Sequence, residues 1–401
     1  MPAAVRLDGT QTFVAASLVL LAGRQLVARL APLRTFSIPE PVAGGVAAAL
    51  LLLALDLGAG VSVRFDTSMQ GPFMLAFFAT IGLGADLRSL AAGGRMLVRF
   101  LAAVLAFLVA QNVVGVGMAR LLGLDPRVGL LAGSIALSGG HGTAAAWGAT
   151  FAREGVASAV ELGLASATFG LVLGGVTGGP VAGWLLRHRD PAPGADAGSD
   201  APPVGFEQPG AVRLITANAL LEILALIAVC IWLGSLAAGA LAGSPLALPV
   251  FVPVLLVGVA LRNGLAWITG YEPFDRAVSV VGNASLALFL AMALMTLRLR
   301  ELADLALPVL AILAVQTALV AAWVAWVTYP VMGRTYDAVV LGAGQCGFGL
   351  GGTPTAIANM QAITTRSGPS RMAFVIVPLV GAFFLDVANA VVIQLFLTVL
   401  R

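Results

Sequence analysis

Long apolar stretches separated by short polar segments dominate the pattern of this 401-residue chain. An α-helix needs about 20 mostly apolar residues to cross the hydrocarbon core of a bilayer. Applied along the chain, this rule predicts about ten spanning helices, over residues 12–33, 41–57, 71–85, 96–119, 157–186, 214–239, 249–269, 278–297, 305–328 and 372–400. The expected fold class is therefore an all-α integral membrane protein.

Two further apolar stretches, residues 128–151 and 338–362, carry too much glycine for plain spanning helices. Each glycine costs a helix about 1 kcal/mol relative to alanine, and Pro354 costs more. Non-helical backbone at membrane depth persists only where protein or water satisfies its amides. We therefore predict two re-entrant hairpins, each with a short helix in, a glycine-rich tip and a short helix out. The alternative is two glycine-rich spanning helices that pack closely against their neighbours.

The composition changes abruptly in the middle of the chain, where residues 187–212 are rich in proline, aspartate, glycine and alanine. Such a segment is expected to be a flexible polar linker. It divides the chain into a first half, residues 1–186, and a second half, residues 213–401. Each half contains five predicted spans and one predicted hairpin.

The two halves resemble each other at matching places. Residues 77–79 and 87–90 match residues 289–291 and 299–302 at a constant spacing. Near the tips, Gly139, Gly142 and Thr143 match Gly349, Gly352 and Thr353. Because five is an odd number of spans, the second half must enter the membrane from the opposite side, which predicts the inverted-topology repeats of secondary transporters. Chance similarity in a simple apolar sequence is the alternative.

Arginine placement sets the expected orientation, because cytoplasmic loops carry an excess of basic residues. With the N-terminus outside, Arg88 and Arg95 fall in one cytoplasmic segment, and Arg187 begins a cytoplasmic linker. Arg64 and Arg153 then fall in outer loops. This orientation places both termini outside and brings one hairpin in from each face of the membrane, so that the two tips meet.

Composition excludes several other classes of protein. The chain is 59% hydrophobic and only 10% charged, whereas soluble domains are about 25% charged. The net charge of +3 comes from 22 arginines against 19 acidic residues, and this small, dispersed excess argues against nucleic-acid binding. Cys230 and Cys346 are too few for a disulfide framework or a metal site. With only two histidines and no catalytic motif, we do not expect an enzyme.

The hairpin tips carry the candidate chemistry. Half-helices that begin at a glycine-rich tip expose N–H groups beside a positive dipole end, which suits a carboxylate. The carbonyls of broken helices, with nearby amide and hydroxyl oxygens, suit Na⁺. The candidate substrate-binding residues are Ser138, Gly139, Gly140, His141, Gly142, Thr143, Gly349, Gly351, Gly352, Thr353, Thr355 and Asp386. The candidate Na⁺ ligands are Gly347, Asn359, Asp386, Asn389 and Asn112.

Simpler roles stand beside these for several residues. Asp386 is expected to be functional, because a charge inside a membrane helix is costly. His141 has the alternative role of a tip residue that hydrogen-bonds the backbone. Gln111, Asn112 and Gln316 have the alternative role of linking neighbouring helices through hydrogen bonds.

The same motifs resemble those of the bacterial sodium/glutamate symporters. The likeness is carried by residues 138–143, residues 346–360 and residues 38–45, and it runs over nearly the whole chain. The chain departs from the expected pattern at Gln345, where a histidine would be expected in relatives. That departure bears only on the role of position 345 itself.

The resemblance implies Na⁺-coupled uptake of L-glutamate across the bacterial cytoplasmic (inner) membrane. It further implies a homodimer with a scaffold region and a transport region, the latter moving as an elevator. The lipid bilayer and glutamate are then the expected partners, and Na⁺ is the coupling ion. The alternative keeps the fold and changes the cargo to citrate or another dicarboxylate, driven by Na⁺ or H⁺.

Overall fold

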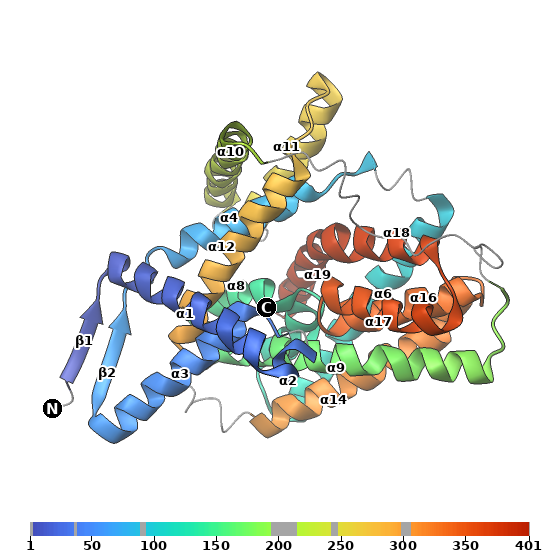
Figure 1. Ribbon diagram of the computed structural model, residues 1–401, viewed down its shortest axis with the longest axis horizontal. Helices are drawn as coiled ribbons and strands as arrows, with labels where there is room; N and C mark the ends of the chain where they lie inside the picture. Colours follow the sequence, from blue (N-terminus) through green and yellow to red (C-terminus); the bar gives the residue numbers. More distant parts are fainter. Residues whose placement is uncertain are drawn as a thin grey trace.

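The computed structural model describes residues 3–35, 38–88, 94–193, 215–241, 248–297 and 306–400. Nearly all of these residues are helical (Figure 1). Among them, eight helices are long and apolar enough to cross a membrane, which confirms a multi-pass, predominantly helical membrane protein. They are α1 (Gly9–Arg29), α3 (Glu40–Ala59), α6 (Gly94–Leu121), α9 (Ala159–His188), α10 (Ala217–Leu241), α11 (Phe251–Thr269), α12 (Asp275–Met295) and the helix Ala306–Val331, made of α14 (Ala306–Trp323), η4 (Val324–Thr328) and α15 (Tyr329–Val331).

The third and tenth predicted spans correspond to shorter helices. The third is α4 (Gln70–Gly84), a helix of 15 residues. The tenth consists of α18 (Arg371–Leu379), η5 (Val380–Phe384) and α19 (Leu385–Leu400), which follow one another without a gap. The π-helical turn of η5 ends two residues before Asp386, and such turns are frequent at functional sites. The number of ten spans therefore stays a prediction.

One element was not expected: a parallel two-stranded sheet. Strand β1 (Ala3–Leu7) pairs with β2 (Val61–Phe65), and Figure 1 shows the two strands at one end of the molecule. Residues 61, 63 and 65 of β2 are apolar and alternate with Ser62 and Arg64, which is a strand pattern. Five residues are too few to compete with the much longer helical pattern that surrounds them, so the sequence analysis missed them.

The helices pack in two groups (Figure 1). The frame group contains α1, α3, α4, α10, α11 and α12, which pack mainly with one another. The hairpin group contains α6, both glycine-rich stretches, α9, α14 and α19. Each half of the chain thus supplies helices to both groups. Fewer contacts join the two groups than join the helices within each group. They include an edge contact between the Phe251 and Trp147 rings, with centroids 5.4 Å apart, and an apolar cluster, here called the apolar joint: Val42, Ala145, Leu164, Phe289, Leu290, Ala293 and Leu294.

Within the frame group, the two halves repeat each other's packing. Helix α1 packs on α3 as α10 packs on α11. Helix α3 of the first half packs on α12 of the second half, and α11 of the second half packs on α4 of the first half. Each half therefore packs against a helix of the other. The same partners recur with the halves exchanged, as expected for two related units that interlock.

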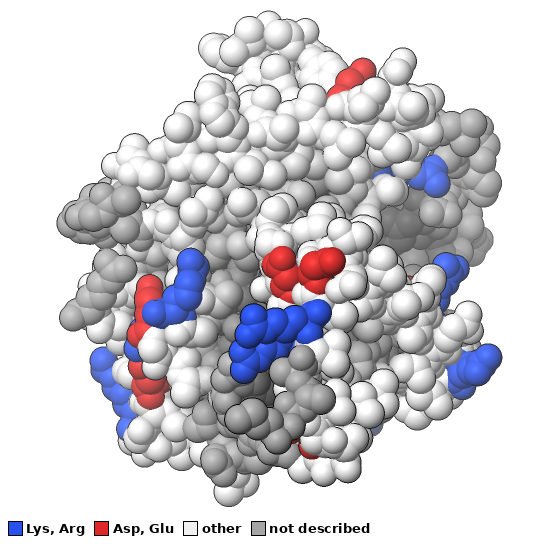
Figure 2. Space-filling view, turned by 90° about the vertical axis from the view of Figure 1, so that its left-hand side faces the viewer, with Lys and Arg blue, Asp and Glu red and all other residues white. Residues whose placement is uncertain are grey.

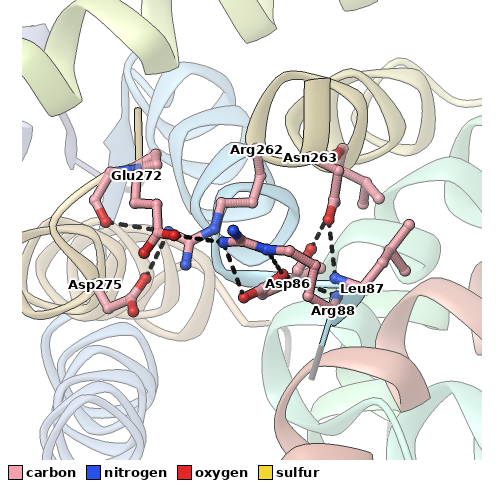
Figure 3. Close-up of polar contacts among 10 residues, drawn as sticks. Asp86, Leu87, Arg88, Arg262, Asn263, Glu272 and Asp275 are labelled. Atoms are coloured by element: carbon pink, nitrogen blue, oxygen red, sulfur yellow. Dashed lines mark hydrogen bonds and ion pairs between the residues drawn. The ribbon is translucent and has the colours of Figure 1, made fainter. Parts of the chain in front are cut away.

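A polar network closes one end of the frame group (Figure 3). We call it the α4–α11 network, and it comprises Asp86, Arg88, Arg262, Asn263, Glu272 and Asp275. The buried Arg262 places Nη1 2.7 Å from an Asp275 carboxylate oxygen and donates to the Pro273 carbonyl. Asn263 donates to the Ala85 carbonyl and accepts from the Leu87 N–H. The network therefore ties the chain that leaves α4 to α11 and to the start of α12.

The start of the linker is attached to the second hairpin. Ala192 forms an isolated bridge with Thr335, just before the second glycine-rich stretch begins. The Ala192 N–H donates to the Arg334 carbonyl at 3.2 Å, and the Tyr336 N–H donates to the Ala192 carbonyl at 2.9 Å. Residues 194–214, the greater part of the predicted linker, lie outside the described residues.

Candidate functional site

The first glycine-rich stretch folds into a helical hairpin. It consists of α7 (Pro126–Leu130), the π-helical η1 (Leu131–Ile135) and α8 (Gly140–Arg153), with a turn at Ser138 and Gly139. Gly140 has a φ of +69°, which suits glycine because it has no Cβ. At the opposite end, Arg127 forms an ion pair with Glu154 at 3.3 Å. The chain therefore enters and leaves this hairpin at one place.

The second glycine-rich stretch folds in the same way. It consists of α16 (Tyr336–Leu350) and α17 (Thr353–Ser367), which pack against each other. The tip is Gly351 and Gly352, and Gly352 has a φ of +153°, a conformation that is essentially confined to glycine. At the base, the Tyr336 hydroxyl donates to the Gly368 carbonyl at 2.6 Å. This hairpin too begins and ends at one place.

The two tips meet inside the protein. The Ser138 hydroxyl of the first tip lies 3.4 Å from the Gly349 carbonyl oxygen of the second. Gln111 of α6 connects them, because its Nε2 donates to Gly349 O at 3.0 Å and its Oε1 accepts from the Ser138 hydroxyl at 2.7 Å. All of these polar groups are buried. Gln111 therefore holds the tips in a fixed relation.

The break in the first hairpin exposes backbone groups that side chains then satisfy. Gly133 leaves the helical conformation, with φ −102° and ψ −130°. The Ser134 N–H next to it donates to Asn112 Oδ1 at 3.3 Å, and the Ser134 carbonyl accepts from Asn389 Nδ2 at 2.9 Å. Asn112 and Asn389 come from α6 and α19, so helices from both halves of the chain converge on this residue.

Several buried polar atoms at this meeting point have no hydrogen-bond partner among the described residues. We call the set of side chains around it the tip cluster, and it comprises Gln111, Asn112, Ser134, Ser138, Gln316 and Asn389. Its unpartnered atoms include the Ser134 hydroxyl, Asn389 Oδ1 and Gln316 Oε1. An unsatisfied buried group costs about 1–3 kcal/mol. Oxygen atoms in this state fit a hard cation such as Na⁺, which takes oxygen ligands.

The second tip supplies the start of a helix and two threonines. Helix α17 begins at Thr353 and contains Pro354 in its first turn, and this helix start points toward the tip. The Thr355 hydroxyl is buried without a partner. Gly381 of η5 approaches Thr353 so closely that a Cβ there would lie 3.2 Å from its hydroxyl. Because α19 follows η5 directly, Asp386 lies one turn before Asn389 on the helix that reaches the first tip.

Other predicted residues make different contacts. His141 Nε2 lies 3.0 Å from the Thr168 hydroxyl of α9, whereas Asn359 Nδ2 donates to the Gly174 and Ala343 carbonyls. The Gly347 carbonyl accepts from the N–H groups of residues 351 and 352 at the tip. Thus His141 and Asn359 both brace their hairpins against α9.

Close packing accounts for the remaining glycines among the predicted residues. A Cβ at Gly142 would lie 2.5 Å from the Phe77 ring, which belongs to the frame group. A Cβ at Gly139 would lie 2.8 Å from Thr143 of the same hairpin. At Gly140 a Cβ would lie 3.9 Å from the Gly351 carbonyl of the opposite tip. The first tip therefore contacts the frame group, its own hairpin and the second tip.

Ser134 and Gln111 stood out in the sequence as polar residues near the first tip, but neither they nor Gln316 were among the candidate ligands. Linking neighbouring helices was the alternative role given to the two glutamines, and Gln316 Nε2 indeed donates to the Gln111 carbonyl at 2.8 Å. What the sequence could not indicate is that Gln111 also contacts both tips.

These features together define a class of protein. Two helical hairpins meet at a buried polar cluster, inside a molecule made of long apolar helices. Secondary transporters bind cargo and coupling ions at such broken helices within the membrane. The fold and the site therefore define a multi-pass membrane transporter.

Comparisons with known proteins define the family. The sequence profile of the family "sodium/glutamate symporter" matches residues 5–369. The sodium/glutamate symporter of Escherichia coli (strain K12) is 57% identical over 392 residues, 98% of each chain. That of Haemophilus influenzae (strain ATCC 51907 / DSM 11121 / KW20 / Rd) is 48% identical over 387 residues, 96% of each chain. The chain belongs to the sodium/glutamate symporter family, and is therefore a transporter and not an enzyme.

Proposed function

We propose that this protein is a Na⁺-coupled symporter that takes up L-glutamate across the bacterial cytoplasmic membrane. The observation that carries the proposal is the tip cluster, where unpartnered oxygens lie beside the starts of two half-helices. The names of the relatives supply the ion and the cargo. They give no support to the citrate alternative.

Glutamate binds between the tips in this proposal. Its carboxylates are held by the N–H groups at the starts of α8 and α17, where the helix dipoles favour negative charge. The hydroxyls of Thr353 and Thr355 add donors at the second tip. Its ammonium group is placed near Asp386, the acidic residue of α19 that lies closest in sequence to Asn389. The unpartnered Thr355 hydroxyl supports this arrangement.

Na⁺ is placed beside the first tip. The Ser134 hydroxyl and Asn389 Oδ1 are oxygens without partners, on residues that already share a hydrogen bond. Asn112 of α6 hydrogen-bonds Ser134, and Asp386 lies on α19, the helix that also carries Asn389. These two residues complete the proposed site. Asn359 and Gly347 belong to the proposal for a further ion at the second hairpin. Their existing hydrogen bonds make them weaker candidates.

Transport in this proposal follows an elevator mechanism built on inverted repeats. The hairpin group moves as the transport region and the frame group stays as the scaffold, in a homodimer. The fewer contacts between the two groups and their exchanged internal packing support this division. Na⁺ entry with the membrane potential supplies about 2.3 kcal/mol per charge per 100 mV, which drives glutamate inward.

The proposed orientation places both termini outside and the linker in the cytoplasm. Leu397 and Leu400, near the end of the chain, lie beside Arg127 and Glu154 at the base of the first hairpin. The linker residue Ala192 lies instead at the base of the second hairpin. Each of these pairs is expected on one side of the membrane, so their proximity supports the orientation.

The test is uptake of labelled L-glutamate into proteoliposomes with and without an inward Na⁺ gradient. We expect Na⁺-driven accumulation by the wild type, and its loss in Asp386→Ala and in Thr353→Ala at unchanged expression. Thr365→Ala is the matched control, because its exposed hydroxyl bonds only the Gln361 carbonyl of its own helix. Wild-type rates in both site variants would remove these residues from the mechanism. Absence of Na⁺-dependent uptake by the wild type would refute the proposed function.

A further inference from the structure

A large cavity lies between the two helix groups, away from the hairpin tips. Its volume is about 1060 Å³. The frame group lines it with the end of α3, strand β2 and the end of α12, while α8 and α9 line the opposite side. Figure 2 views the molecule from the side of β1 and β2 and shows basic and acidic side chains lying next to each other within a largely uncharged surface.

Four charged side chains line this cavity. Arg64 and Asp56 come from the frame group, whereas Arg153 and Glu161 come from the hairpin group. The Arg153 side chain donates to the Ala149 carbonyl and to the Thr150 hydroxyl of its own helix. Within the described part of the chain, neither Arg64 nor Arg153 forms an ion pair with a carboxylate. Both guanidinium groups are therefore available to an anion.

The cavity is aligned with the first tip. Residues four apart lie on one face of a helix, and on α8 this series runs from Arg153 and Ala149 in the cavity to Ala145 and His141. Ala145 belongs to the apolar joint, and His141 contacts α9 near the tip. The same order holds on α9, where Glu161 lines the cavity, Leu164 is in the joint and Thr168 contacts His141. The apolar joint thus separates the cavity from the tip.

We propose that this cavity is an entry site that captures amino dicarboxylates before they pass the apolar joint and reach the tips. The proposal rests on the proposed function, since it takes glutamate as the cargo. Two guanidinium groups match the two carboxylates of such a substrate, whereas Asp56 and Glu161 already have interactions of their own. In the orientation proposed above, the cavity opens to the outside, from which the cargo is taken up.

The physical effect expected of such a site is on capture. A cleft that carries charges complementary to a substrate raises its local concentration and its association rate, and salt reduces the effect. The screening length is about 8 Å at physiological ionic strength, so only charges that line the cavity contribute strongly. The site therefore acts on the KM for glutamate and leaves the maximal rate of transport unchanged.

The test compares Arg64→Gln, Arg153→Gln and the double variant with Arg276→Gln in proteoliposomes. Arg276 is the matched control, because it is an exposed arginine in the first turn of α12, whereas the opposite end of that helix lines the cavity. We expect the KM for L-glutamate to rise about threefold or more in the double variant, with the maximal rate and the Na⁺ dependence preserved. Arg276→Gln should keep the wild-type KM. Added choline chloride should raise the KM of the wild type more than that of the double variant.

A wild-type KM in the double variant, or an equal rise in Arg276→Gln, would overturn the entry site and leave the symport function standing. If the double variant fails to insert, the two single variants decide by the same criterion. A wild type that shows no Na⁺-driven uptake would instead refute the proposed function itself. The two failures are therefore distinguishable within one experiment.

Discussion

The tip cluster and the α4–α11 network are both polar assemblies in an apolar protein, and they treat their polar groups differently. In the α4–α11 network, each carboxylate and amide has a protein partner. Arg88, for example, forms ion pairs with two carboxylates, those of Asp86 and Glu272 (Figure 3). In the tip cluster, oxygens of Ser134, Gln316 and Asn389 remain without one. The first assembly fastens helices together, whereas the second keeps oxygens available.

This difference separates stability from function. In the α4–α11 network, Arg262 Nε has no partner among the described residues, but every carboxylate is paired, so changing the network should alter the stability of the frame group. An unpaired buried oxygen carries a cost of about 1–3 kcal/mol, which a bound cation would recover. Changes in the tip cluster should therefore alter ion dependence while the fold persists.

Between these two assemblies, the larger effect is expected from Ser134→Ala in the tip cluster. The Ser134 hydroxyl makes no hydrogen bond with any described residue, so its removal costs no contact within that part of the chain. If it binds Na⁺, the half-saturating Na⁺ concentration for glutamate uptake should rise about tenfold, which corresponds to about 1.4 kcal/mol. The thermal stability of the Na⁺-free protein should not fall. Uptake measured over a range of Na⁺ concentrations gives the first value, and thermal unfolding in detergent gives the second.

Ser166→Ala is the control for that variant. The Ser166 hydroxyl is also buried and unpartnered, but it belongs to α9 and not to the tip cluster. It should leave the Na⁺ dependence unchanged. An equal shift in both variants would mean that the effect is one of general packing. No shift in Ser134→Ala would remove this residue from the ion site.

A smaller effect, and one of the opposite kind, is expected from Asp275→Ala in the α4–α11 network. This change leaves the buried Arg262 guanidinium with the Pro273 carbonyl but without its carboxylate. Hydrogen bonds to charged groups contribute about 1.5–3 kcal/mol, but exposed ion pairs contribute about 1 kcal/mol or less. Because Asp275 is exposed, we expect a loss of about 1 kcal/mol. The unfolding temperature should fall, whereas the KM values for glutamate and Na⁺ should not change.

Arg276→Ala provides the comparison for that result, because Arg276 is the exposed neighbour of Asp275 on α12. It should change neither stability nor transport. A shift of the KM in Asp275→Ala at unchanged stability would contradict the separation between the two assemblies. It would place the α4–α11 network in the transport mechanism.

Much of the fold could be predicted from hydropathy, because spanning helices must be long and apolar. Backbone breaks at Gly140 and Gly352 fall within the two glycine-rich stretches, while the re-entrant hairpins themselves stay a prediction. The β1–β2 sheet could not be predicted with the same ease. Its pairing joins segments that lie far apart in the chain, and no local pattern specifies such a partner.

The site was predictable in location more than in detail. Glycine-rich tips and an acidic residue in a helix pointed to the region that contains Ser138, Gly349 and Asp386. The bridging role of Gln111 depends on a distance between helices, which the sequence does not contain. Likewise, Asn359 was predicted as an ion ligand from its oxygen, but its amide group contacts α9.

The smallest expected effect concerns pH and separates the two assemblies once more. Burial alone would raise the pKa of the Asp86 carboxyl, but hydrogen bonds from the Arg88 side chain and backbone outweigh it and lower the pKa below its usual range. A carboxyl with a lowered pKa stabilises the folded state above its unfolded pKa of about 3.9, and this contribution is lost as the pH falls through the folded value. The side chains of the tip cluster do not ionise in this range.

The unfolding temperature of the wild type should therefore exceed that of Asp86→Asn by a constant margin above about pH 5, and the margin should shrink toward pH 3. Because this ion pair is largely exposed, the margin should be small and should decrease with added salt. Ser134→Ala should show no such pH-dependent margin. A difference between wild type and Asp86→Asn that persists unchanged at pH 3 would show that Asp86 acts through packing. The α4–α11 network would then be held by its hydrogen-bond geometry and not by its charges.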